Sequence, residues 1–218
     1  MTIAVVHGPL KMPDSAFAMW VRGELDEYLH VPDDSRVEII GGEIVVSPSA
    51  RYGHGRVVGD IQESLFAAKL DPAFRWRSGQ NSDLSLAEIE DGYIPDLFLI
   101  DRDIDAELTA ADADFIRPDQ IGLAVEVTSP SNAADDRPPG LRRRRRTKWN
   151  GYAATGVPFD LLIDRDPRVC TATLFSEPDR KVGRYERHRC WKFGEPIVLP
   201  EPFGLTIPTD TWTGWRED

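Results

Sequence analysis

A strand–helix–strand pattern over residues 121–164 constrains the fold more than any other part of the chain. The alternating segment "LAVEVT" predicts a strand over 121–128, and the run "FDLLID" predicts another within 157–164. Between them, a helix is predicted over 141–155, because Gly156 and Pro158 are typical of a helix end. Two strands joined by a helix run parallel, so we expect a mixed sheet with helices packed on it.

Other segments extend this pattern. We expect a helix over 14–30, a hairpin in "RVEIIGGEIVV" that turns at Gly41 and Gly42, and an amphipathic helix over 53–70. Two more strands are predicted at 74–81 and 93–101, with a polar connection over 105–120. The segments "VCTATLFSE", "VGRYERHR" and "EPIVLP" predict a C-terminal β meander. The expected fold class is α/β, as one domain over residues 1–218.

Composition excludes several classes of protein. The chain has 218 residues, 41% hydrophobic and 29% charged, which is typical of a folded globular protein. A net charge of −11 argues against a protein that coats nucleic acid through clustered lysine and arginine. No run is apolar enough to cross a membrane, no signal peptide is evident, and Cys170 and Cys190 lack zinc-site spacing. A cytoplasmic location is expected.

Two carboxylates stand in or beside predicted strands. Along "LAVEVT", Leu123, Val125 and Val127 share one face, so Glu126 points away from the main apolar face. Asp96 directly precedes another apolar run, in "YIPDLFLID". A carboxylate removed from water requires a cationic partner. Paired carboxylates suit a hard divalent cation, and a nearby lysine could stabilise charge on a phosphate under attack.

These segments carry a resemblance to a known family. "YIPDLFLID", "LAVEVTSPSN" and "KWNGYAATGVPFDLLID" resemble motifs of the Uma-type putative restriction endonucleases, a bacterial branch of the PD-(D/E)XK nuclease superfamily. "RVEIIGGEIVVSPSARYGH" is similar to the opening motif of that family. The resemblance implies a restriction-endonuclease-like fold with a mixed central β-sheet flanked by helices, and cleavage of phosphodiester bonds with Mg²⁺ or Mn²⁺.

The resemblance also implies roles for individual residues. Asp96 matches the aspartate of the "PD" motif and Glu126 the acid of the "(D/E)XK" motif, both metal ligands, with the Val127 backbone carbonyl as a third. Thr128 stands where that motif has its lysine, and Lys148 matches the lysine that replaces it from the following helix. Glu38 matches an additional upstream acid. His54 either belongs to the opening motif or merely begins a helix.

An arginine-rich segment departs from the family pattern. Residues 135–148 hold seven basic side chains against two acidic ones. Arg142, Arg143 and Arg146 are candidates to contact nucleic acid, although such a run is more often a solvated face. DNA is the expected substrate, and nucleases of this type often act as homodimers. Two alternatives stay open: a non-catalytic nucleic-acid or protein interaction module with the nuclease fold, and a phosphoesterase for small nucleotides.

Overall fold

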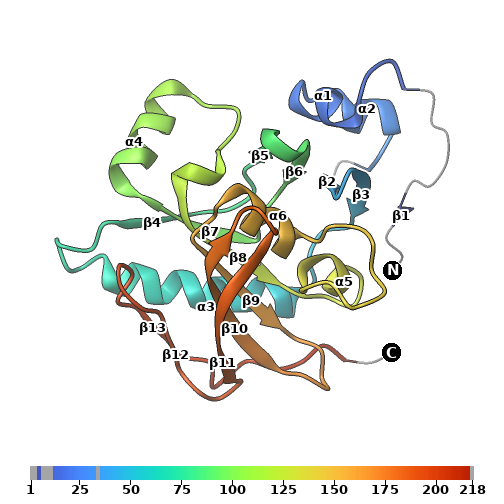
Figure 1. The fold of residues 1–218 in the computed structure, drawn as a ribbon. Coiled ribbons are helices and arrows are strands. Elements are labelled where there is room, and N and C mark those ends of the chain that lie inside the picture. Colours follow the sequence, from blue (N-terminus) through green and yellow to red (C-terminus); the bar gives the residue numbers. More distant parts are fainter. Residues whose placement is uncertain (1–3, 6–11, 33–34, 217–218) are drawn as a thin grey trace.

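The computed structural model describes residues 4–5, 12–32 and 35–216 of the chain. Its central element is a six-stranded sheet in the order β11-β10-β9-β8-β7-β4 (Figure 1). The strands are β4 (Trp76–Gly79), β7 (Leu97–Asp101), β8 (Ile121–Val127), β9 (Phe159–Asp164), β10 (Thr171–Asp179) and β11 (Arg184–Lys192). Strands β8 and β9 are parallel and all other neighbours antiparallel. The predicted mixed central sheet is confirmed.

A second, five-stranded sheet has the order β1-β3-β2-β6-β5. Its strands are β1 (Ala4–Val5), β2 (Arg36–Ile40), β3 (Glu43–Ser47), β5 (Leu84–Leu86) and β6 (Asp91–Tyr93). The predicted hairpin is confirmed, since β2 pairs with β3. Its turn places Gly41 and Gly42 at φ angles of 59° and 78°, which glycine adopts without steric cost.

Six α-helices are present in the described part of the chain: α1 (Ala16–Val21), α2 (Leu25–Leu29), α3 (Tyr52–Ala68), α4 (Arg102–Ala111), α5 (Ala133–Asp136) and α6 (Lys148–Thr155). Short 3-10 turns occupy Ala87–Ile89 and Pro118–Gln120. The helix predicted over 14–30 is two helices, because Gly23 has a φ of 67° between α1 and α2. No helix in the described ranges is long and apolar enough to span a bilayer.

The helix predicted over 141–155 begins only at Lys148. Thr147 is its N-cap, and the Thr147 and Asn150 side chains form a reciprocal capping box. The preceding arginines point to separate acids on other elements: Arg145 pairs with Glu43 and Arg146 with Asp91. These tertiary ion pairs hold the segment in a non-helical path that local spacing did not reveal.

Two further predictions were wrong. The segment 105–120 is not a simple polar connection, because it contains most of α4. The Asp101 side chain caps that helix, and Ile104 and Leu108, one turn apart, pack against the core. The predicted meander is confirmed only for β10 and β11. Its third segment contributes β12 (Ile197–Val198), which pairs with β13 (Thr206–Ile207) instead of joining the main sheet.

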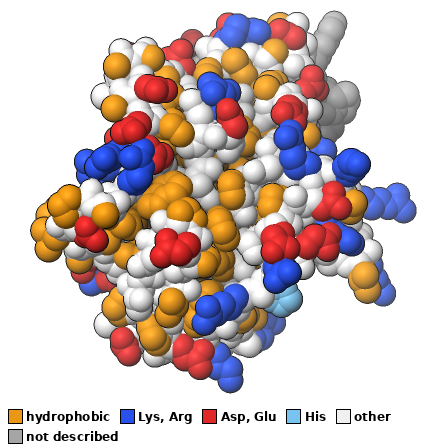
Figure 2. Space-filling view, turned by 60° about the vertical axis from the view of Figure 1, so that its left-hand side comes forward, with side chains coloured by type: hydrophobic (Ala, Val, Ile, Leu, Met, Phe, Trp, Pro, Cys, Tyr) orange, Lys and Arg blue, Asp and Glu red, His pale blue; other side chains and the backbone are white. Residues whose placement is uncertain are grey.

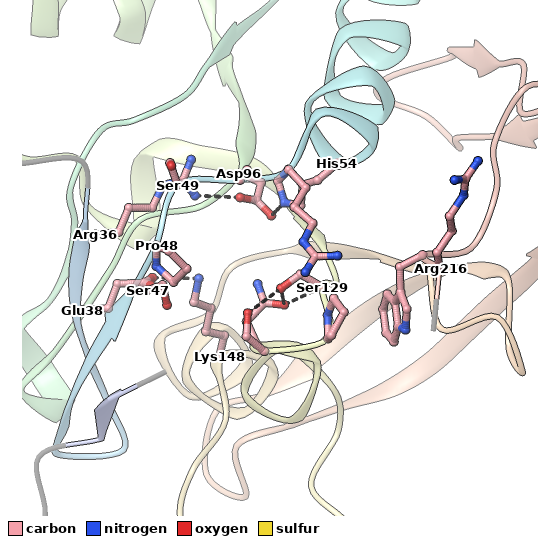
Figure 3. A pocket seen from close by; sticks show the side chains of 16 residues that line it. Arg36, Glu38, Ser47, Pro48, Ser49, His54, Asp96, Ser129, Lys148 and Arg216 are labelled. Carbon is pink, nitrogen blue, oxygen red and sulfur yellow. Dashed lines mark hydrogen bonds and ion pairs between the residues drawn. The ribbon is translucent and has the colours of Figure 1, made fainter. Parts of the chain in front are cut away.

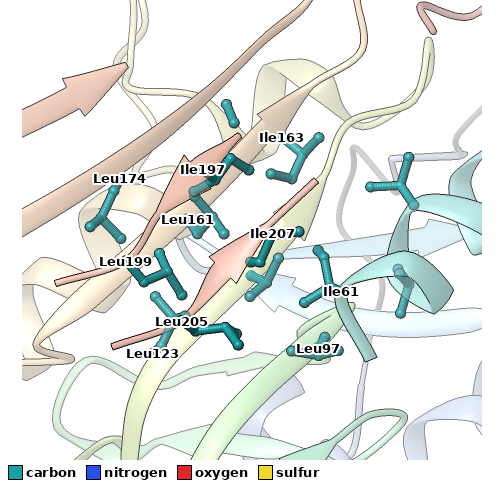
Figure 4. Packing of buried hydrophobic residues seen from close by; sticks show 14 of the residues in the cluster. Ile61, Leu97, Leu123, Leu161, Ile163, Leu174, Ile197, Leu199, Leu205 and Ile207 are labelled. Atoms are coloured by element: carbon teal, nitrogen blue, oxygen red, sulfur yellow. The ribbon is translucent and has the colours of Figure 1, made fainter. Parts of the chain in front are cut away.

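The two faces of the six-stranded sheet are covered by different layers. One face packs against α3, β12 and β13 (Figure 4), and it includes Leu123, Val125 and Val127. The other face packs against α6 and the second sheet, with Ala124, Tyr152 and Tyr93 in its core. Glu126 has the opposite direction from Val125 and Val127, as predicted, so its carboxylate meets α6. This layering brings the two halves of the candidate site together.

Candidate active site

A cavity of about 200 Å³ lies where β2, the start of α3, the start of β7 and the start of α6 converge (Figure 3). Glu38, His54, Asp96 and Lys148 line its floor and are all buried. These residues are spread over more than one hundred positions of the sequence. The parallel β8-α6-β9 crossover and the β2–β3 hairpin are therefore what assemble the site.

Asp96 is held by three donors. Its Oδ1 accepts a hydrogen bond from Arg36 at 2.8 Å. Its Oδ2 lies 2.9 Å from His54 Nε2 and accepts the backbone N–H of Val127, also at 2.9 Å. Burial opposes ionisation, but the interactions with His54, Lys148 and Arg36 outweigh it and hold the pKa of Asp96 well below its usual range. Asp96 is therefore an ionised carboxylate.

Lys148 lies between two acids. Its Nζ is 2.7 Å from Glu38 Oε1 and 3.3 Å from both Glu126 oxygens. The Lys148 residue is only 3% exposed, so its amine faces inward. Burial disfavours the charged amine, yet the surrounding carboxylates, Glu126 and Glu38 first, raise the pKa of Lys148 well above its usual range. The structure thus places a buried amine next to Glu126, where Thr128 supplies none.

The pKa of Glu126 is raised to near neutral pH. It accepts a hydrogen bond of 2.5 Å from the Tyr152 hydroxyl, one helical turn beyond Lys148. Burial raises the pKa of Glu126 to about 8 against the attraction of Lys148, and the charges of Asp96 and Glu38 act in the same direction as burial. Glu38 in turn accepts the backbone N–H of Ile94, two residues before Asp96. Carboxylates outnumber cations in this cluster.

Two more buried acids adjoin the cluster, and sequence reasoning did not assign either to the site. Asp136 is 1% exposed, and neither carboxylate oxygen has a hydrogen-bond partner in the described part of the chain. Burial and the charge of Glu126 raise the pKa of Asp136 well above its usual range. Asp160, on β9, is likewise buried, and burial raises its pKa. Alternation along "FDLLID" was the available signal for Asp160, since it places that side chain on the other face of the strand from Phe159 and Leu161.

His54 and Arg36 are functional candidates that the sequence only weakly indicated. Both contact Asp96, and both lie in the opening motif, His54 in the first turn of α3 and Arg36 at the start of β2. Nothing in a local pattern distinguishes them from surface residues. They contact Asp96 only because the hairpin and α3 pack beside β7.

The three arginines predicted to contact nucleic acid lie in different environments. Arg143 pairs with Asp135, and Arg146 pairs with the buried Asp91 and donates to the Ile89 carbonyl. Arg142 is exposed to solvent. Intramolecular ion pairs thus account for two of the three arginines without any ligand, and a nucleic-acid contact stays a prediction.

The donor set fits a divalent cation that has few protein ligands. Four buried acids, Glu38, Asp96, Glu126 and Asp136, interact electrostatically with Lys148, and the Asp136 oxygens have no hydrogen-bond partner in the described part of the chain. The described residues contain no preformed group of three metal-binding side chains. Mg²⁺ commonly keeps several waters and binds one or two carboxylates, so this set is compatible with it.

Comparisons with known proteins agree with this architecture. A family model for Uma2, described as "putative restriction endonuclease", matches residues 25–210. The crystal structure of a "putative nuclease belonging to DUF820" from Anabaena variabilis aligns with a TM-score of 0.58 at 15% sequence identity, and the alignment covers 85% of this chain and 94% of that one. At this identity the likeness shows a shared fold. No curated protein is significantly similar to the chain.

Proposed function

Since the chain belongs to the Uma2 family of putative restriction endonucleases, we propose that it is a metal-dependent nuclease that hydrolyses phosphodiester bonds in DNA. The observation that carries this proposal is the buried contact of Lys148 with Glu38 and Glu126, beside the ionised Asp96 at the floor of a cavity. A purely structural ion pair would not require this excess of buried acids at a cavity. Buried acids whose pKa values are strongly shifted by burial and by their neighbours are concentrated at functional sites, so their presence here favours one.

Asp96 and Glu126 would hold the cation, and the Val127 backbone carbonyl would be its third protein ligand. The Val127 N–H already donates to Asp96, which ties the two strands together at this point. When bound, Mg²⁺ or Mn²⁺ supplies Lewis-acid polarisation of the phosphoryl oxygens. Arg36 and His54 hold the Asp96 carboxylate in position through both of its oxygens.

Lys148 would stabilise negative charge that develops on the phosphate. Neighbouring carboxylates raise the pKa of the Lys148 amine, and Glu38 fixes the amine in place, so little reorganisation accompanies the reaction. Glu38 acts as the positioning residue for this amine. Tyr152 orients Glu126 from the same face of α6.

Cleavage assays on supercoiled plasmid, single-stranded DNA and RNA, with Mg²⁺, Mn²⁺ or EDTA, test the proposal. We expect metal-dependent cleavage that Asp96→Asn and Lys148→Ala each reduce by at least 100-fold, in the range for loss of one electrostatic stabiliser. Glu186→Gln, on the exposed part of β11, is the matched control and should retain full activity. Calorimetry with Mg²⁺ should show binding lost in Asp96→Asn and kept in Lys148→Ala.

Two outcomes would contradict the proposal. Absence of cleavage together with metal-independent binding of nucleic acid or protein would favour a non-catalytic interaction module. Hydrolysis restricted to mononucleotides or dinucleotides would favour a phosphoesterase, which the small cavity and the net charge of −11 would also accommodate.

A further inference from the structure

The mouth of the cavity differs chemically from its floor. The lining residues around Lys148 are buried and acidic, whereas Arg51 and Arg216 are exposed and Trp215 is half-buried, which places these three at the mouth. An anionic group that approaches therefore meets arginines before it meets the carboxylates. An indole ring beside two arginines is a combination that binds nucleotides, since bases stack on aromatic rings and phosphates pair with guanidinium groups.

The segment that carries Trp215 is fixed to the rest of the molecule. The Trp215 backbone N–H donates to the Arg165 carbonyl at 2.9 Å, and Arg165 Nε donates to the Thr213 carbonyl at 3.2 Å. Gly214 packs so closely that an added Cβ would lie 2.9 Å from Pro167 Cα. Trp215 is half-buried, and these contacts hold it at the cavity. Both Trp215 and Arg216 lie outside the 25–210 range that the family model matches.

The floor of the cavity is recessed, and this limits which ligands can reach Asp96 and Lys148. Asp96 and Lys148 are 4% and 3% exposed, at the bottom of a cavity of about 200 Å³. That volume is below the roughly 300–1,000 Å³ of pockets that enclose drug-sized ligands. A phosphate flanked on both sides by base-paired nucleotides is part of a wide, stiff rod and cannot descend into such a space. The phosphate and sugar of an unpaired nucleotide can, because the backbone on either side rotates freely while the base remains at the mouth.

Building on the proposed function, we propose that the cavity selects unpaired nucleic acid, with one base stacked on Trp215 and an adjacent phosphate bound by Arg216 and Arg51. The substrate class is then a single-stranded segment or strand end rather than an intact duplex. Stacking is tolerant of sequence because every base has a π-face. The net charge of −11 agrees with this choice, since the two arginines at the mouth suit few phosphates.

Fluorescence polarisation in metal-free buffer tests the proposal without cleavage. The probes are a labelled 12-nucleotide DNA, the same sequence in RNA, and the corresponding DNA duplex. We expect single strands to bind at least tenfold more tightly than the duplex. Trp215→Leu should weaken single-strand binding by roughly 5- to 100-fold, the range for loss of one stacked base, while Trp215→Phe should retain most of it.

Matched variants separate this effect from misfolding. Arg216→Gln should weaken single-strand binding and lower its dependence on salt by roughly one unit of slope, whereas the exposed Arg184→Gln on β11, which does not line the cavity, should change neither. If Trp215→Leu does not fold, by circular dichroism, then Trp215→Phe and Arg216→Gln still decide the question.

The outcomes distinguish the two proposals. Binding that depends on Trp215 without any cleavage would overturn the nuclease proposal and leave this inference standing. Equal affinity for duplex and single strand, or unchanged binding in both Trp215→Leu and Arg216→Gln, would overturn the inference even if the protein cleaves DNA.

Discussion

At the scale of single residues, the site is a cluster of buried charges in which each group sets the protonation of its neighbours. Lys148 and Asp96 are held in their charged forms, while Glu126 is shifted toward its neutral form. Thr128 does not share in this cluster. Its hydroxyl donates to Asp164 and accepts the Arg165 backbone N–H, so a lysine there would break contacts to β9 rather than replace Lys148.

The raised pKa of Glu126 predicts a pH-dependent stability. The folded pKa, about 8, exceeds the usual 4.5, so the folded protein binds a proton that the unfolded chain does not. Its contribution is fully present below pH 4.5 and is lost as pH rises through about 8. We therefore expect the melting temperature of the metal-free protein to fall between pH 6 and 9, and Glu126→Gln to flatten this dependence. An equally steep profile in Glu126→Gln would refute the assignment.

The pH dependence of Mg²⁺ binding provides a second measure of the ionisation of Glu126. A cation binds the ionised carboxylate, so binding should tighten as pH rises toward 8 and should release protons. Calorimetry in two buffers of different ionisation enthalpy reports those protons directly. A constant affinity from pH 6 to 9 would mean that Glu126 is not a ligand.

At the scale of elements, the β2–β3 turn joins the second sheet to the arginine segment. The backbone N–H groups of Gly41 and Gly42 both donate to Asp91, which also accepts hydrogen bonds from Tyr93 and Arg146. Asp91 is fully buried. One carboxylate therefore fixes the turn and the residues that lead into α6, and so contributes to the position of Lys148.

The two turn glycines predict unequal effects of alanine. Both have positive φ, which disfavours a side chain by roughly 1–2 kcal/mol. An added Cβ at Gly42 meets nothing within 4 Å, whereas at Gly41 it would lie 2.8 Å from the Arg146 carbonyl oxygen. We expect Gly42→Ala to lower the free energy of unfolding by about 1–2 kcal/mol and Gly41→Ala by clearly more. Urea unfolding with an unchanged m-value measures both, and equal losses would argue against the observed packing.

At the scale of the whole molecule, a net charge of −11 is the sum of many acidic and basic side chains. On the face shown in Figure 2, acidic and basic side chains are interspersed around a band of hydrophobic ones. Within the arginine segment, Arg143, Arg145 and Arg146 pair with Asp135, Glu43 and Asp91, respectively. A net charge of −11 disfavours the attraction of long polyanions, which is consistent with recognition at the cavity.

The arginine segment predicts a contrast between neighbouring residues. Arg146→Gln removes one hydrogen bond to the buried Asp91 carboxylate and one to the Ile89 carbonyl, and should lower the free energy of unfolding by about 1–3 kcal/mol. Arg142→Gln, at an exposed position, should stay within about 0.5 kcal/mol of the parent protein. If Arg142 contacts a phosphate, its replacement should also reduce the salt dependence of binding by roughly one unit of slope. Thermal and urea unfolding of both variants, with binding titrations at several salt concentrations, provide the measurements.

The sequence by itself determined the parts of this protein that depend on local pattern. Alternation predicted β8 and the direction of Glu126, helical spacing predicted α3, and paired glycines predicted the β2–β3 hairpin. The order of strand, helix and strand predicted the parallel pair. These features follow from periodicity and backbone preference, which act over a few residues and can be read along the chain.

Only the tertiary structure decided where the charged side chains meet. Asp96 is joined to His54 and Arg36, and Lys148 to Glu38, across separations of 42 to 110 positions that no local pattern encodes. The arginine segment is non-helical because its ion pairs lie on distant elements, and Trp215 reaches the cavity only through its contact with Arg165. The energy of a buried charge depends on its neighbours in space, so the site could be decided only by the packed molecule.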